Sequence, residues 1–167
     1  MGAGKILILI GALLTLVSTF FFSLFHLGGN IYGYGVGFIF NIPNIMEHAD
    51  AYAFLIGTET MIVYIVAIVF IVFLLAGILQ LVGLASRVVA IIGSIIALGI
   101  GILFLLVALD VFTDITPFAI LLVDEAIADG IFPFDVALGD VLSLGTITLI
   151  AGGALGLIGG IMGTSDF

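Results

Sequence analysis

Long apolar runs alternate with polar stretches along the chain. Four runs are long enough to form helices that cross a hydrocarbon core about 30 Å thick, at residues 6–26, 59–84, 88–109 and 141–162. Two polar stretches, 27–58 and 110–140, follow the first and the third run. This pattern predicts an all-α integral membrane protein: a four-transmembrane-helix bundle over residues 1–167, with a short strand and interfacial helices in two loops on the same side.

The composition favours one membrane domain without a separate soluble domain. Of the 167 residues, 64% are hydrophobic and 8% are charged, whereas soluble domains carry about 25% charged residues. No small-residue cleavage site follows the first run, so we expect a retained helix instead of a signal peptide. Because the chain has no cysteine, disulfides and thiolate metal sites are excluded.

The positions of the charges predict the orientation. Lys5 precedes the first run and Arg87 lies in the short turn between the second and third, so both bases lie on one side. The positive-inside rule makes that side cytoplasmic. We therefore expect a multi-pass protein of the cell membrane with both termini inside and the acidic loops outside. The net charge of −9 argues against nucleic acid as a partner and favours a cation or a basic protein.

The first loop combines an alternating segment with a capping pattern. Residues 31–40 alternate between large side chains and a face that is mostly glycine, which predicts a strand whose open edge can pair with another strand or protomer. A glycine-rich loop at the lipid interface is the alternative. After Pro43, Asn44 and Glu47 have the spacing of a capping box. We expect an interfacial helix that begins there and ends at Gly57.

The first loop also contains candidate metal ligands. Imidazole and carboxylate groups suit zinc or copper, and four residues offer them: His26, Glu47, His48 and Asp50. Their spacing matches no established metal motif, and the alternative is that Glu47 caps a helix while the histidines lie at the interface. We predict no cofactor and keep metal binding by these four residues as a hypothesis.

The second loop is strongly acidic. Thr116 and Pro117 predict the start of a surface helix that runs to Asp129 and stops at Gly130. Carboxylates in or beside the loops are expected to attract cations, namely Glu59, Asp110, Asp114, Asp124, Glu125, Asp129 and Asp140. Divalent cations such as Ca²⁺ are possible ligands, although no EF-hand loop is present. A solvated acidic face is the alternative.

Small residues recur at every fourth position in three of the runs. The first run carries Gly11, Thr15, Thr19 and Ser23, and the third and fourth carry Gly93, Ala97, Gly101, Gly152, Gly156 and Gly160. Such stripes let helix backbones approach closely. A single tight bundle would use them internally. Because three stripes are present, we instead predict that those of the third and fourth runs are oligomerisation surfaces.

The runs lack the residues of a catalytic centre. No charged residue lies at the middle of a run, which argues against a proton pump or an ion-coupled transporter. The serines have no histidine at span depth to activate them, namely Ser18, Ser23, Ser94 and Ser143. Gln80 is the most polar side chain of the runs, and we expect it to form a hydrogen bond between helices. We predict that the protein is not an enzyme.

The predicted layout resembles that of claudins and, more distantly, of tetraspanins. It has four spans with both ends on one side, a short turn between the second and third spans, and a first loop with a strand. The tryptophan and paired cysteines of the claudin first loop are absent, so no functional residue carries over. The resemblance implies a membrane scaffold or adhesion role.

We therefore predict a non-enzymatic scaffold or assembly protein that contacts membrane lipid and forms a homo-oligomer or joins a larger membrane complex. One alternative is a cation channel or transporter with an acidic vestibule. The other is a metal-binding accessory subunit of an enzyme.

Overall fold

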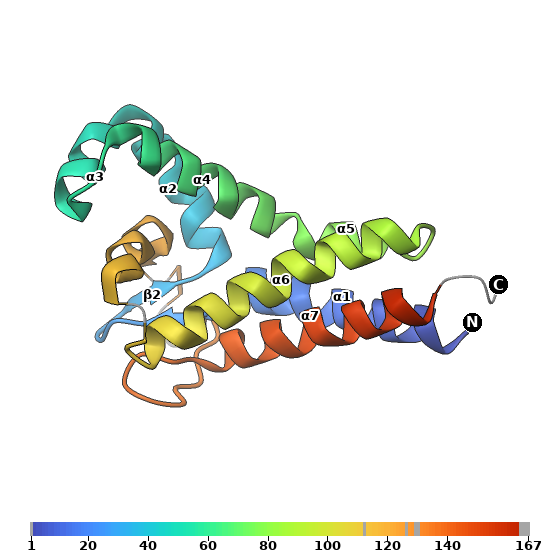
Figure 1. Cartoon of the computed structure of the whole chain (residues 1–167). Helices are drawn as coiled ribbons and strands as arrows, with labels where there is room; N and C mark the ends of the chain where they lie inside the picture. The colour runs from blue at the N-terminus through green and yellow to red at the C-terminus, as the bar shows by residue number, and fades with distance from the viewer. Residues whose placement is uncertain (1, 112, 126, 129–130, 164–167) are drawn as a thin grey trace.

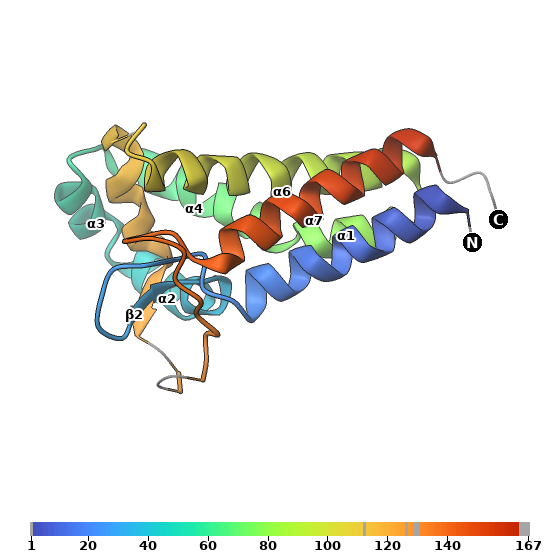
Figure 2. The same ribbon diagram turned by 90° about the horizontal axis from the view of Figure 1, so that it is seen from below.

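Three helices of the computed structural model are long and apolar enough to cross a membrane: α1 (Ala3–Phe20), α6 (Arg87–Ala108) and α7 (Leu144–Met162). The structure describes residues 2–111, 113–125, 127–128 and 131–163, with the backbone alone at 113–116. The three helices lie side by side, with both chain ends at one end of the bundle and the loops at the other (Figures 1 and 2). Three of the four predicted runs are thereby confirmed as helices, although α1 ends at Phe20 instead of residue 26.

The second predicted run is not one continuous helix. It divides at Leu75 into α4 (Thr60–Leu74) and α5 (Ala76–Val82). Helix α5 packs in the bundle, whereas α4 diverges from α6 toward the loops (Figure 1). The side chains explain the divergence: Gly77 of α5 lies against Leu16 of α1, but large rings such as Phe73 separate α4 from α6. Counting α4 with the preceding α3 (Ala49–Ile56), to which it is bent by 100°, gives a fourth candidate span.

Glycines bring α1 and α7 into backbone contact. A Cβ atom added to Gly11 would lie 2.6 Å from both the carbonyl oxygen of Gly152 and the amide nitrogen of Gly156. A Cβ added to Gly152 would lie 2.8 Å from the backbone nitrogen of Thr15. Any side chain at these positions would therefore push the two helices apart.

The other predicted oligomerisation residues are also used within the chain. Gly93 packs on the backbone of α5, Gly101 packs on Ile150, and Gly160 packs on Ile91. All six residues of the predicted surfaces are buried: Gly93, Ala97, Gly101, Gly152, Gly156 and Gly160. The stripes serve one bundle in this structure, so they no longer support self-association.

A three-stranded antiparallel sheet joins the two loops. Strand β2 (Ile31–Gly33) pairs with β1 (Phe25–His26) on one side and with β3 (Val123–Glu125) on the other. The prediction of a strand over 31–40 was therefore wrong beyond Gly33. Both edges of β2 are already paired within the chain, so the open edge expected for another protomer is absent at this strand.

Residues 35–47 form helix α2 (Gly35–Glu47), not a strand or an irregular loop. Gly35 contacts the Thr19 carbonyl, and Phe38 is buried against Phe70 of α4. Helical packing against α1 and α4 overrides the alternation with period two. Because Pro43 lies inside α2, the predicted helix start at Asn44 was wrong. The predicted stop at Gly57 is confirmed, since Gly57 ends α3 with a left-handed φ of 77°.

The second loop differs from its predicted helix. Residues 113–122 form the 3₁₀ helix η1 (Thr113–Leu122), and the chain then extends as β3. Leu121 and Leu122 are fully buried, so the end of η1 is anchored in the core and the next residues pair with β2. Asp129 and Gly130, where the predicted helix ends, lie outside the described residues.

Candidate functional site

A polar network joins the ends of α1 and α7 to the second loop. The Asp135 oxygen Oδ1 accepts a hydrogen bond from the hydroxyl of Ser23, which lies just beyond α1, and a 2.7 Å hydrogen bond from Ser143, which precedes α7. His26 Nδ1 lies 3.2 Å from Ser143 Oγ. Both serines are fully buried, whereas Asp135 and His26 are partly exposed. Four residues from three separate segments therefore meet at one point.

The hydrogen bonds of this network run in a different direction from those around an activated serine. A serine nucleophile gives its proton to a neighbouring base. Here the Ser143 hydroxyl donates its hydrogen bond to Asp135. A hydrogen bond between Ser143 and His26 therefore requires the Nδ1–H tautomer of His26, and that nitrogen cannot accept a proton from the serine. Ser143 also has no exposed surface for a substrate. His26 lies on β1 at the loop end, outside the long helices, and does not activate Ser143. The arrangement is therefore that of a structural tie.

Tyr34 forms a second tie between the loops. Its hydroxyl donates a 2.8 Å hydrogen bond to the Glu125 carbonyl, and its side chain is fully buried. Burial, together with the nearby negative charge of Asp124, raises the pKa of Tyr34 from 10.0 to about 12. The neutral phenol is therefore the form that the fold holds.

Alkaline pH should weaken the tie at Tyr34. Because the folded-state pKa is raised, the unfolded chain loses this proton first, and stability falls as the pH rises from about 10 to about 12. We expect an ultraviolet phenolate titration to show one late tyrosine that Tyr34→Phe removes, with a loss of about 1 kcal/mol at neutral pH from the missing hydrogen bond. Tyr64→Phe is the control and should leave the late step in place.

The structure does not bring the four predicted metal ligands together. His26 lies on β1 beside Ser143, whereas Glu47, His48 and Asp50 lie exposed around the junction of α2 and α3. Among the described residues, no group of three or more His, Cys, Asp or Glu side chains is placed to hold a metal ion. The proposed four-residue site is therefore wrong as a geometric unit, because the sheet and α2 direct its members to different places.

The predicted cation-attracting residues are spread over the loop end. Glu59 precedes α4, Asp110 follows α6 with a φ of 56°, and Asp124 and Glu125 lie on β3. Asp140 is exposed in the second loop. The side chain of Asp114 and the whole of Asp129 lie outside the described part of the chain. Within the described part of the chain, these carboxylates do not form a group of three or more that could hold a metal ion.

Gln80 forms the hydrogen bond predicted for it. The Thr15 hydroxyl of α1 donates to Gln80 Oε1 of α5 over 3.1 Å, and Gln80 is fully buried in the bundle. Its amide nitrogen Nε2 has no hydrogen-bond partner among the described residues. The contact links α1 to α5 next to the glycine interface, where Gly156 borders both Gln80 and Ser94.

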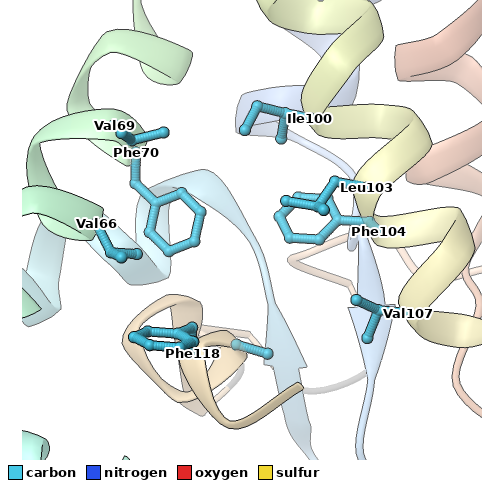
Figure 3. Close-up of a pocket in the computed structure, with 9 residues that line it drawn as sticks. Val66, Val69, Phe70, Ile100, Leu103, Phe104, Val107 and Phe118 are labelled. Carbon is cyan, nitrogen blue, oxygen red and sulfur yellow. The ribbon is translucent and has the colours of Figure 1, made fainter. Parts of the chain in front are cut away.

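An apolar cavity of about 260 Å³ lies between α4, α6 and η1. Phe70 and Phe104 extend into it from the two helices, with Phe118 of η1 at its loop end (Figure 3). The centres of the Phe70 and Phe104 rings are 6.4 Å apart. This cavity could not be recognised in the sequence, because apolar residues that line a cavity look the same in sequence as those that fill a core.

Comparison of the chain with protein-family models, with curated proteins and with solved structures found no match. The class of protein therefore follows from the fold itself. The chain is a mostly helical protein with three helices able to span a membrane and a small sheet that unites its two loops.

Proposed function

We propose that this chain is a four-span membrane protein that acts as a non-enzymatic scaffold or assembly subunit through its loop end. The proposed spans are α1, α6, α7 and the run formed by α4 and α5 together. This run is preferred to the α3–α4 pair because that pair is bent by 100°. The glycine interfaces hold the bundle together, and the loop end is the surface offered to a partner. A claudin-like layout is part of this proposal.

The observation that carries the proposal is that the two loops pack into one ordered layer, which consists of α2, α3, η1 and the sheet. The sheet pairs β2 with β3, Tyr34 bonds to Glu125, and the Asn41 side chain donates to the Leu121 carbonyl over 3.2 Å. These ties join α2, η1 and the sheet, and the Tyr52 hydroxyl of α3 donates to Asn41 of α2. A layer held in this way loses little conformational entropy when a partner binds.

Charge indicates the kind of partner. The loop layer exposes carboxylates such as Glu47, Asp50 and Glu125, whereas both bases of the chain, Lys5 and Arg87, lie at the other end of the bundle. A basic protein segment would meet a field of complementary sign at the loop layer. We therefore assign the outward contact to a basic partner, or to a second copy bridged by cations.

The membrane arrangement is tested by labelling single cysteines, since the chain has none of its own. Glu47→Cys and Ala85→Cys replace exposed residues at opposite ends of the bundle, and both orienting bases are kept. We expect an impermeant maleimide to label Glu47→Cys in intact cells and Ala85→Cys only after permeabilisation. Labelling of both in intact cells would contradict the four-span arrangement, and the reversed result would contradict the orientation.

The scaffold role is tested by the native mass of the protein extracted from its own membrane in mild detergent. We expect a complex larger than the monomer that dissociates at high salt. The combined variant Glu47→Gln, Asp50→Asn, Glu125→Gln should release it, whereas Arg87→Gln at the other end should not. A monomer under all gentle conditions would refute the scaffold assignment.

A further inference from the structure

A continuous apolar groove runs along α4 and α6. The cavity beneath η1 shares Val69 and Ile100 with a second hollow of about 320 Å³ that lies farther along the two helices. Ile68 and Ile95 border this second part, and both are largely exposed. Phe118 of η1 borders the groove at its loop end (Figure 3), and the exposed Ile68 and Ile95 leave its farther part open to the surface.

The residues that line the groove are suited to a bound hydrocarbon chain. The side chains around both hollows are aliphatic or aromatic, from Val66 on α4 to Phe118 on η1. A buried water needs two to four polar partners, and this groove does not offer them. If α4 and α6 cross the membrane as proposed, the open side faces lipid tails, and filling the groove restores dispersion contacts that a void would forfeit.

The charges at the loop end select the head group of that occupant. Asp110 is exposed one turn beyond Val107, which lines the cavity, and Glu59 precedes the first turn of α4. Lys5 and Arg87 are at the opposite end of the bundle. An anionic head above the groove would therefore meet carboxylates and no base, whereas a head without net negative charge would not be repelled.

A polar pocket adjoins the groove at this end. Ala119 lines both the cavity and a smaller apolar pocket, and that pocket shares Leu55 and Ile120 with one that contains Asn41 and Tyr52. The Tyr52 hydroxyl donates to Asn41 Oδ1 over 3.0 Å. The pocket with the neutral groups of Asn41 and Tyr52 thus neighbours the loop end of the groove through shared lining residues. Such groups suit an amphiphile head without net negative charge.

We propose that the α4–α6 groove binds the hydrocarbon chain of an amphiphile whose head group carries no net negative charge, with the head beside Asn41 and Tyr52. This site rests on the proposed membrane placement of α4 and α6. It is independent of whether the loop layer binds a protein partner.

The test uses photo-crosslinking in nanodiscs. The full chain is placed in nanodiscs with a phosphatidylcholine that carries a diazirine on one acyl chain, and labelled peptides are identified by mass spectrometry. We expect the label to concentrate on residues 66–72 of α4 and 99–107 of α6. Labelling spread evenly over the outer faces of α1, α6 and α7, or crosslinks between two copies at the groove, would overturn the proposal.

Gly99→Leu blocks the groove without disturbing the fold. Gly99 lines the second hollow, and a Cβ added there meets nothing within 4 Å. A leucine displaces roughly two methylenes of the bound chain, so we expect groove labelling to fall about tenfold. Ile102→Phe on the exposed side of α6 adds bulk outside both hollows and should leave labelling unchanged. Unchanged labelling in Gly99→Leu would overturn the site.

A second lipid probe tests the head-group assignment separately. A phosphatidylglycerol probe with the same diazirine chain should label the groove several-fold less than the phosphatidylcholine probe, and the deficit should shrink in Asp110→Asn. Equal or stronger labelling by the anionic probe would overturn the head-group selection. The expected cysteine labelling at Glu47→Cys and Ala85→Cys without groove crosslinks would refute this site alone. Failure of both the cysteine labelling and the groove crosslinking would refute the membrane placement.

Discussion

Replacing Gly152 with leucine is expected to disrupt the bundle. A Cβ at this position would lie 2.7 Å from Thr15 Oγ1 and 2.8 Å from the Gly11 carbonyl oxygen. Backbone atoms cannot move aside as a flexible side chain can, so α1 and α7 must separate. Overpacking typically costs 1–3 kcal/mol and occasionally more. We expect a loss of at least about 3 kcal/mol, which lowers the melting temperature by roughly 6–12 °C, measured by circular dichroism in detergent.

Gly99→Leu is the matched control for this prediction. It makes the same substitution at another helical glycine, but Gly99 is exposed and has open space around it. Its melting temperature should stay within about 2 °C of the wild type. Equal melting temperatures for Gly152→Leu and the wild type would show that α1 and α7 do not pack as described. Loss of an oligomer with an intact monomer would instead restore the reading of the stripe as an oligomer surface.

The second large effect is expected from Asp135→Leu. This change removes the acceptor shared by Ser23 and Ser143, two hydroxyls that are fully buried. An unsatisfied buried donor costs about 1–3 kcal/mol, so we expect a total loss of about 2–4 kcal/mol. The second loop should detach from the ends of α1 and α7 before the bundle melts. Limited proteolysis within residues 131–143 should accelerate at temperatures where the helices remain folded.

Two variants separate the hydrogen bonds from other effects of Asp135→Leu. Asp135→Asn keeps one acceptor oxygen and should cost about 1 kcal/mol. Asp140→Leu places the same side chain at an exposed carboxylate of the same loop and should change stability by less than about 0.5 kcal/mol. Similar proteolysis of Asp135→Leu and Asp140→Leu would contradict the tie.

The glycine stripes show why spacing alone did not predict their partner. A stripe of Gly152, Gly156 and Gly160 identifies the face that a helix offers for close approach, but it is equally suited to another copy or to another helix of the same chain. The structure places Gly11 of α1 on that face. The partner depends on how four helices share a limited set of small faces, which no single run contains.

Residues 35–47 show the same limit for local structure. Their alternation has the period of a strand, yet they form α2. Gly35 and Phe38 bury surface against α1 and α4, and the free energy of that burial exceeds a local propensity difference of about 1 kcal/mol or less. In the second loop, η1 likewise replaces a predicted regular helix, because its buried leucines and the β2–β3 pairing constrain it.

By itself, the sequence determined the apolar helices, the presence of a short turn between the second and third runs, and the gathering of bases at one end and carboxylates at the other, because hydropathy and charge act residue by residue. The turn was expected at residues 85–87 and lies at 83–86. Only the tertiary structure decided that α4 leaves the bundle with an apolar groove between it and α6, and that the glycines pack within the chain. It also decided that Asp135 meets Ser23, Ser143 and, through Ser143, His26. These features need residues that are up to about 160 positions apart, as Gly4 and Gly163 are. Their contacts form only when the whole chain has packed.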